Sequence, residues 1–276
     1  MARYDLHCHS TCSDGLLSPG DVVRRAAAQG VDVIALTDHD QLAGIEEARE
    51  AALGAEITLI AGAELSVTWE RETVHVVALA VDPSNDALAE GLAGVRSGRD
   101  QRARRIGDAL AAAGVPDAFA GARAYAASDE LISRTHFARH LVESGQVRDM
   151  KDAFRRFLTR GKPGYVAHVW PTLTEAVGWI HGAGGQAVIA HPGRYQLTAT
   201  GMRRLLGQFR DLGGDAIEIL SPSHTTAQTA EFATLARAFG FKASCGSDWH
   251  GPGESRWELG QVPPMVDTVD PVWADW

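Results

Sequence analysis

Long apolar runs and paired cysteines are both missing from this sequence. No stretch approaches the roughly 18 consecutive apolar residues of a membrane span. The N-terminus has no basic region followed by an apolar stretch, because His7 lies where that stretch would be. The three cysteines, Cys8, Cys12 and Cys245, form no C-x-x-C pair, which argues against a disulfide framework. We therefore expect a cytoplasmic protein without a membrane segment, whose cysteines are small core residues.

An excess of positive charge is missing too. The formal net charge is −9, which argues against general binding of nucleic acid. Residues 96–160 nevertheless carry 13 Lys and Arg against 8 Asp and Glu, so one basic segment lies inside an acidic protein. This distribution indicates a local anion site rather than a track for a polynucleotide.

The sequence does have a regular alternation of short apolar runs with helical patterns. Its 276 residues, 45% of them hydrophobic, are enough for a large core. Such alternation is typical of βα units, and seven runs predict an α/β fold with a closed or nearly closed barrel of the TIM type. The runs are Asp5–His7, Val33–Thr37, Thr58–Ala61, Val74–Val81, Ala187–Ala190, Ala216–Leu220 and Lys242–Cys245. Helices are expected over 19–29, 44–53, 172–181, 201–212 and 225–239.

The alternation stops between Asp86 and Lys162. This stretch is rich in Ala, Arg and Asp, has a helical period and contains no strand pattern. A Gly-Lys-Pro-Gly turn at 161–164 then returns the chain to the barrel. We predict a barrel built from residues 1–85 and 165–276, and an inserted domain of two or three helices over residues 86–164 that recognises the substrate.

Ligand-type side chains follow nearly every expected strand. His7 and His9 share one face of the first strand, because alternate residues of a strand point the same way. In parallel barrels the carboxyl ends of the strands meet at one rim. A gathering of imidazoles and carboxylates without Lys or Arg is costly unless a cation is present, so we predict a multinuclear metal site. The polar residues in or just after the expected strands are His7, His9, Asp14, Asp38, His39, Asp40, Glu64, His75, His191, Glu218, Ser221, Asp248 and His250.

Mixed imidazole and carboxylate ligation suits Mn, Fe or Zn and does not choose between them. Asp38 and Asp40 flank His39, and either could orient that imidazole or cap a helix. Arg194, three residues after His191, could grip a phosphate oxygen or lie in a solvated loop.

The ordered motifs "DLHCHSTCSDG", "ALTDHD", "GAELSV" with "HVVALAV", "IAHPGR" and "GSDWH" resemble those of the polymerase-and-histidinol-phosphatase (PHP) superfamily. The resemblance spans residues 5–250. Within the superfamily, "ISRTHFARHLV" and "GKPGYV" are most similar to the nucleoside 3′,5′-bisphosphate phosphatases, a group that includes an exoribonuclease trimming short RNAs from the 5′ end.

The resemblance implies a distorted seven-stranded (β/α)7 barrel that holds two or three divalent metal ions, Mn foremost, with Fe or Zn as alternatives. His7, His9, Glu64 and Asp248 match the ligands of one ion. Glu64, as a bridging ligand, matches those of a second ion together with His75 and His191. Asp14, His39 and His250 match those of a third.

The implied activity is the release of the 3′-phosphate from nucleoside 3′,5′-bisphosphates, with short 5′-phosphorylated RNAs as further substrates. An activated hydroxide, held through Glu64 and Asp248, would attack phosphorus. His250, interpreted first as a ligand, is also a candidate to assist the leaving group. No membrane association and no stable protein partner are expected.

The basic segment offers candidates for a second anion site. The resemblance implies that Arg134 and His140 bind the second phosphate, and Ser133 and His136 lie beside them. If this stretch is helical, His136 and His140 share a face, and Arg139 is expected to face water.

Three other interpretations remain. An amidohydrolase-type deaminase also begins with His-x-His, but no lysine follows any strand here, and Asp248-x-His250 has no role in such a site. A histidinol-phosphate phosphatase or general phosphomonoesterase of the same superfamily is a second alternative. A phosphate-binding module without catalysis is a third, against which all nine ligand positions hold competent residues.

Overall fold

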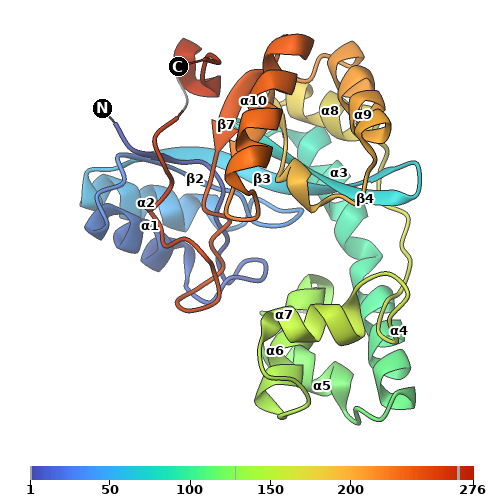
Figure 1. Cartoon of the computed structure of the whole chain (residues 1–276). Coiled ribbons are helices and arrows are strands. Elements are labelled where there is room, and N and C mark those ends of the chain that lie inside the picture. The colour runs from blue at the N-terminus through green and yellow to red at the C-terminus, as the bar shows by residue number, and fades with distance from the viewer. Residues whose placement is uncertain (1, 128, 266–267) are drawn as a thin grey trace.

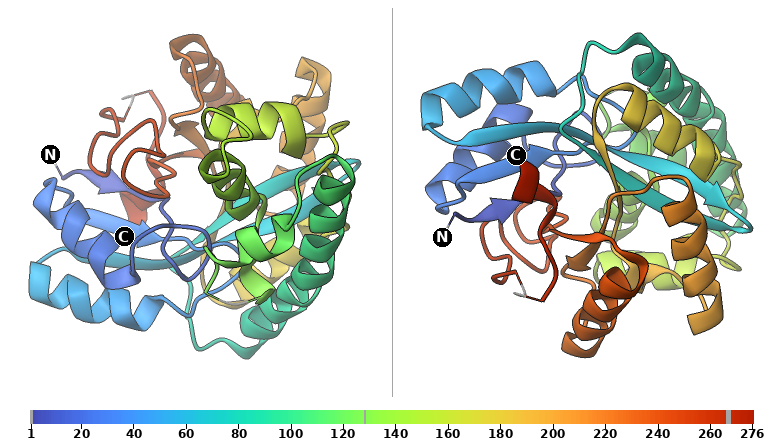
Figure 2. Two further views of the ribbon diagram at one scale, coloured as in Figure 1. Left: turned by 90° about the horizontal axis from the view of Figure 1, so that it is seen from below. Right: turned by 90° about the horizontal axis from the view of Figure 1, so that it is seen from above.

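The computed structural model describes residues 2–127, 129–265 and 268–276 and contains a single seven-stranded sheet. The strands follow one another around the sheet in chain order. The N–H of Leu6 donates to the carbonyl of Cys245 over 3.1 Å, so the last strand returns to the first and the predicted barrel is nearly closed (Figure 2). The strands are β1 (Tyr4–Asp5), β2 (Val33–Leu36), β3 (Thr58–Trp69), β4 (Glu72–Leu79), β5 (Gln186–Ile189), β6 (Ala216–Leu220) and β7 (Lys242–Cys245).

One strand runs against the others. β1, β2 and β3 pair in parallel, as do β5, β6 and β7, whereas β4 is antiparallel to both of its neighbours. β3 also continues eight residues beyond the predicted end at Ala61, because its second half forms a hairpin with β4. Polar residues such as Glu64 interrupt the apolar run there, so the apolar pattern alone made the strand look too short.

The reversed direction of β4 has a consequence for His75. His75 lies near the beginning of β4 and pairs with Ser66 of β3. In a reversed strand, the first residues reach the rim at which the parallel strands end. His75 therefore lies at the same rim as Glu64, although no strand ends at His75.

Five helices cover the barrel at the predicted positions. Ser18 caps the first of them by accepting from the N–H of Asp21 over 3.2 Å, with Pro19 at the start of the helix. The helices are α1 (Pro19–Ala28), α2 (Ile45–Ala55), α8 (Leu173–Gly182), α9 (Ala199–Asp211) and α10 (Thr226–Phe239), and short 3₁₀ turns lie at Asp129–Leu131, Pro192–Arg194 and Val272–Asp275. No helix in the described part of the chain is both long and apolar enough to cross a membrane.

A separate helical lobe projects from the barrel (Figure 1). Residues 86–164 hold five α-helices among the described residues, where two or three were predicted. They are α3 (Asp86–Ser97), α4 (Arg99–Ala112), α5 (Ala118–Arg123), α6 (Arg134–Glu143) and α7 (Met150–Ala153), the last followed by a π-turn over Phe154–Leu158. Leu88 and Leu92 of α3 belong to the large core of the barrel. The later helices share a second hydrophobic cluster, with Phe137 and Leu141 among its buried residues.

The cysteines are free, as expected. Cys8 and Cys245 are buried and Cys12 is half-buried. The domain division at residues 86 and 164 stays a prediction. Helix α3 lies within the predicted insertion, but its side chains pack in the core of the barrel.

Candidate active site

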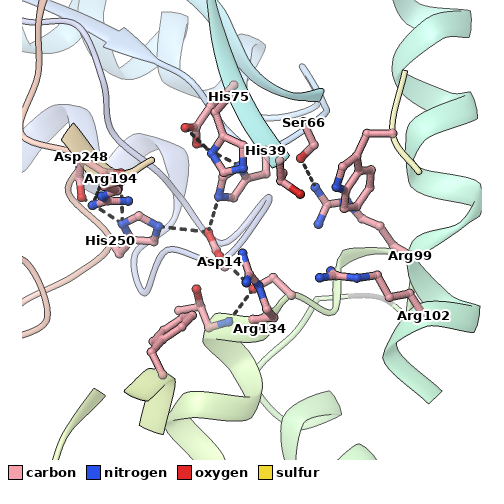
Figure 3. A pocket seen from close by; sticks show the side chains of 16 residues that line it. Asp14, His39, Ser66, His75, Arg99, Arg102, Arg134, Arg194, Asp248 and His250 are labelled. Carbon is pink, nitrogen blue, oxygen red and sulfur yellow. Dashed lines mark hydrogen bonds and ion pairs between the residues drawn. The ribbon is translucent and has the colours of Figure 1, made fainter. Parts of the chain in front are cut away.

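The structure brings all nine predicted ligands together at one rim of the barrel (Figure 3 labels five of them). In each of four groups, the nitrogen and oxygen atoms that could ligate a metal lie within 4.8 Å of one another. The groups are His7, His9 and Asp248; His7, Glu64 and His191; His39, Glu64 and His75; and His9, Asp14, His39 and His250.

Glu64 lies at the centre of the cluster. Its Oε1 is 2.8 Å from His75 Nδ1 and 2.8 Å from His191 Nε2. Its Oε2 is 2.9 Å from His39 Nδ1 and 3.3 Å from His7 Nε2. The two oxygens thus face different imidazoles, which is the arrangement a bridging carboxylate requires.

The local backbone is adapted to this convergence. A Cβ added at Gly15 would lie 2.4 Å from the carbonyl oxygen of His9, so only glycine lets the turn after Asp14 fold back against the first strand. His191 and Asp248 have φ angles of 28° and 47°, which are uncommon for residues with a side chain. Strained backbone of this kind concentrates at functional sites, where the surrounding structure enforces it.

A shell of hydrogen bonds holds the ligands. Glu218 is 2.6 Å from His7 Nδ1 and accepts from the N–H of His191 over 2.5 Å. The sequence places Glu218 at the rim, at the end of a buried strand, but does not predict that it contacts His7. Such partners orient metal-bound imidazoles in known metal sites.

The hypothesis that Asp38 or Asp40 orients His39 is wrong. Asp38 instead accepts from the backbone N–H of Ser10 over 2.8 Å and from the hydroxyl of Ser13 over 2.5 Å. Asp40 accepts from the N–H of Ser66 over 2.7 Å and pairs with Arg99. Both carboxylates therefore fix loops at the rim, and neither forms a hydrogen bond with His39 in the described part of the chain.

Electrostatics keep the carboxylates of the cluster ionised. Burial opposes the charge of Asp14, yet His39 and His250 hold the pKa of Asp14 well below its usual range. Burial also opposes the charges of Glu64 and Asp248. His75 and His39 nevertheless lower the pKa of Glu64, and Arg194 and His7 lower the pKa of Asp248.

The imidazoles fall into two classes. Burial lowers the pKa of His9 to about 3, and that of His191 to about 4, so these rings are neutral. Although burial opposes it, Glu218 and Glu64 raise the pKa of His7 well above its ordinary value. Neutral imidazoles and ionised carboxylates are the forms that bind metals. The elevated pKa of His7 shows that its acidic surroundings favour additional positive charge.

The donor atoms fit a metal cluster. Within the described residues, His7 Nε2, His9 Nε2 and Asp14 Oδ1 are buried and have no hydrogen-bond partner. Buried polar atoms are nearly always paired, so three such donor atoms in one cluster fit the coordination of a cation. The donor set of the nine residues therefore suits divalent metal ions.

Arginines of the lobe face this cluster across a cavity (Figure 3). Arg99 pairs with Asp40, and its guanidinium lies 4.9 Å from the ring centre of Trp170. Arg102 donates to the carbonyl of Val166 over 3.3 Å. Arg134 lies 5.9 Å from the ring centre of Phe154, and all three arginines and both rings line the cavity. Sequence reasoning predicted Arg134 but missed Arg99 and Arg102, whose only signal was the local excess of basic residues.

This wall of the cavity is short of negative charge. Burial, together with Arg134 and Arg99, lowers the pKa of Arg102 to about 9. Burial also lowers the pKa of Arg134. Since Arg99 is already paired with Asp40, the two arginines left to bind an anion are Arg102 and Arg134.

The other predicted binding residues lie in different places. Ser133 lines the cavity and donates to Asp14 Oδ2 over 2.8 Å. Arg194 also lines it and pairs with Asp248. His136 Nδ1 accepts from the N–H of Ser133 over 3.0 Å, so this ring closes the cap of α6.

The structure does not bring His140 to the cavity. A Cβ on Gly121 would lie 2.0 Å from His140 Nδ1, so the ring packs against α5. The physical reason is the helix itself, because only the first turn of α6 faces the cavity. The expectation that Arg139 faces water is also wrong, because Arg139 is 5% exposed and donates to the barrel.

Comparisons with known proteins show which proteins this chain resembles. A family model described as the PHP domain matches residues 5–96. A 3′,5′-nucleoside bisphosphate phosphatase of Chromobacterium violaceum is 50% identical over 100% of this chain and 96% of its own length. A 5′-3′ exoribonuclease of Haemophilus influenzae is 44% identical over 98% of both chains. A solved structure described as an amidohydrolase from Chromobacterium violaceum, with bound sulfate and no metal, superposes with a TM-score of 0.96 at 50% identity, covering 99% of this chain and 95% of that one.

Proposed function

The chain belongs to the PHP family, and from this premise we propose that it removes the 3′-phosphate from nucleoside 3′,5′-bisphosphates. The observation that carries the proposal is the pairing of two unlike sites across one cavity. The ligand cluster lies on one side and Arg102 and Arg134 lie on the other. A substrate with two phosphates matches a cavity that offers two separate anion sites.

The nine-residue cluster would hold the divalent ions, for which we propose Mn²⁺. When bound, the ions supply Lewis-acid activation of water and neutralise charge on the phosphoryl group. The residues of this chain hold the ions and orient the ligands. Glu64 and Asp248 keep the charge needed to hold the cations, and Glu218 orients His7. Arg194, at the edge of the cluster, is placed to exchange its contact with Asp248 for one with a phosphate oxygen.

Arg134 and Arg102 would bind the 5′-phosphate as a handle. A guanidinium grips two phosphate oxygens at once, and burial strengthens the contact by excluding water. Phe154 and Trp170 also line the cavity and offer flat apolar surfaces to a nucleoside. Ser133, next to Arg134, holds the carboxylate of Asp14 in the ligand cluster by a hydrogen bond.

A second activity, 5′-3′ exoribonuclease action on short RNA, is favoured by the 44% identity to the Haemophilus influenzae enzyme. In a 5′-phosphorylated dinucleotide, the linking phosphate has the same position relative to the 5′-phosphate as the 3′-phosphate of a bisphosphate. One cavity can therefore accept both substrates. We also propose a cytoplasmic location, which the free cysteines favour.

The lining of the cavity argues against the alternative of an amidohydrolase-type deaminase. That chemistry uses a lysine in the middle of the barrel, and no lysine is among the described residues that line the cavity. The alternative of a binding module without catalysis is contradicted by the full-length identity to a phosphatase.

Product analysis tests the proposal directly. With adenosine 3′,5′-bisphosphate and Mn²⁺, we expect adenosine 5′-monophosphate and inorganic phosphate, because the 5′-phosphate is held away from the ligand cluster. Chromatography of the products against both monophosphate standards distinguishes the two bonds. Adenosine 3′-monophosphate as the product would reverse the roles of the two anion sites.

A comparison of kcat/KM for different substrates separates the remaining alternatives. A 5′-phosphorylated diribonucleotide and histidinol phosphate are assayed beside the bisphosphate under the same conditions. The proposal expects kcat/KM to be lowest for histidinol phosphate, which has only one phosphate. A higher kcat/KM for histidinol phosphate than for the bisphosphate would contradict it.

A further inference from the structure

Helix α6 connects the lobe to the ligand cluster by two hydrogen bonds to the same residue, Asp14. Its cap, Ser133, donates to the carboxylate of Asp14 over 2.8 Å. Arg139, about one and two-thirds turns further on, donates from Nη2 to the backbone carbonyl of Asp14 over 2.6 Å. The lobe therefore holds both the side chain and the backbone of a predicted ligand.

The same arginine holds the segment that carries a second ligand. Arg139 Nε and Nη2 donate to the two carboxylate oxygens of Glu254, each over 2.8 Å. Glu254 lies four residues after His250, and the turn between them is closed by a bond from the N–H of Glu254 to the carbonyl of Gly251 over 3.2 Å. The N–H of His250 in turn donates to the hydroxyl of Ser255 over 2.8 Å.

The two segments meet at the ligand atoms. His250 Nε2 lies 3.4 Å from Asp14 Oδ1. Behind these atoms, the N–H of Leu16 donates to the carbonyl of His250 over 2.7 Å. One buried guanidinium thus bridges the loop of Asp14, the turn after His250 and the hydrophobic cluster of the lobe, to which Phe137 and Leu141 of the same helix belong.

We propose that Arg139 is a positioning residue for one metal subsite, the one formed by Asp14, His39 and His250. This inference rests on the proposed function, because it takes these three residues as metal ligands. Arg139 touches none of the ligand atoms and acts by fixing the two loops at the separation that a cation requires. A planar guanidinium is suited to this task, since its donors have a rigid geometry.

Docking of the lobe and occupancy of this subsite are then coupled. If the docked lobe strengthens metal binding at the subsite, the bound metal must stabilise the docked lobe by the same free energy. The phosphate handle on Arg134 belongs to the same helix as Arg139. Binding of a bisphosphate and binding of this ion are therefore expected to reinforce each other.

The test is a titration of the metal-free protein with Mn²⁺ alone, followed by measurement of bound metal per chain. In Arg139→Met, which removes the donors and keeps an apolar side chain of similar length, we expect one ion to bind about 10–100-fold more weakly, the usual effect of losing a partner of a metal ligand. The affinity for the other ions stays at the wild-type value. Arg139→Lys keeps the charge but lacks the planar fork, so its loss is intermediate.

Arg204→Met is the matched control. Arg204 also pairs with a glutamate, since its guanidinium lies 3.0 Å from the carboxylate of Glu70 in the turn after β3, and it is not among the residues that line the cavity. We expect this variant to bind all ions as the wild type does. Melting of the metal-free proteins measures any general loss of stability, and the titrations are made well below the lowest melting temperature.

Asp14→Asn distinguishes failure of the inference from failure of the proposed ligand set. If Asp14→Asn loses an ion and Arg139→Met binds every ion with wild-type affinity, the positioning role is wrong. If Asp14→Asn itself keeps every ion, the proposed ligand set is wrong and the inference falls with it. Should Arg139→Met fail to fold, Arg139→Lys decides, and wild-type affinity for all ions in that variant overturns the role.

Discussion

Glu64→Gln is expected to reduce phosphate release from a nucleoside 3′,5′-bisphosphate to the background rate. The two oxygens of Glu64 face five imidazoles, so the variant removes the charge that joins the groups of ligands. Lewis-acid stabilisation is worth several kcal/mol and each 1.4 kcal/mol is tenfold in rate, so we expect a loss of roughly 1,000-fold or more. Steady-state kinetics with Mn²⁺ present measures it.

Chelation of the wild-type protein should have the same effect and should be reversed by added Mn²⁺, whereas added Mn²⁺ should not rescue Glu64→Gln. Glu231→Gln, which changes an exposed glutamate of α10, serves as the control and should keep wild-type activity. Circular dichroism establishes that each variant is folded. A chelated protein that hydrolyses the bisphosphate at the original rate would show that the cluster is not a catalytic metal site.

Arg134→Ala is expected to lower kcat/KM for the bisphosphate selectively. Arg134 lines the cavity opposite the ligand cluster, and within the described residues its donors reach only the carbonyl of Leu158, over 3.4 Å. Loss of a charged hydrogen bond costs roughly 1.5–3 kcal/mol, which is about 10–150-fold in kcat/KM. Hydrolysis of p-nitrophenyl phosphate, which has no second phosphate, should change little.

Arg123→Ala is the matched control for Arg134, since Arg123 is another arginine of the lobe but pairs with Asp129 outside the cavity. It should leave both substrates unaffected. Arg102→Ala should resemble Arg134→Ala in direction. Equal losses on the bisphosphate and on p-nitrophenyl phosphate in Arg134→Ala would mean that this side chain supports the cluster or the fold, and the phosphate handle would have to be assigned elsewhere.

Much of the ligand cluster could be predicted from the sequence because five of its nine members follow strand ends. His7 and His9 follow β1, His39 follows β2, His191 follows β5, and Asp248 follows β7. A buried strand is a readable apolar run, and a barrel collects strand ends at one rim. The nature of the side chains then indicates the chemistry, because clustered carboxylates and imidazoles require a cation.

The parts that were not predicted have different causes. The direction of β4 is set by its hairpin with β3, and it was missed because β3 was predicted to end at Ala61, which left no short turn between the two strands. Glu218 was recognisable as a polar residue at the rim, but its bond to His7 joins residues 211 positions apart. The number of helices in the lobe was underestimated because short helices give weak periodic signals.

The sequence by itself determined the barrel, its order of strands and helices, and the set of residues that meet at the rim, since each of these follows from short-range patterns of polarity. The tertiary structure alone decided what faces that rim. The packing of the lobe buries Arg139 against the loops of two predicted ligands and turns His140 away toward α5. It also brings Arg102 and Arg134 to one wall of the cavity. These placements depend on how one helical lobe docks on the barrel, which is a matter of long-range packing that residue spacing does not encode.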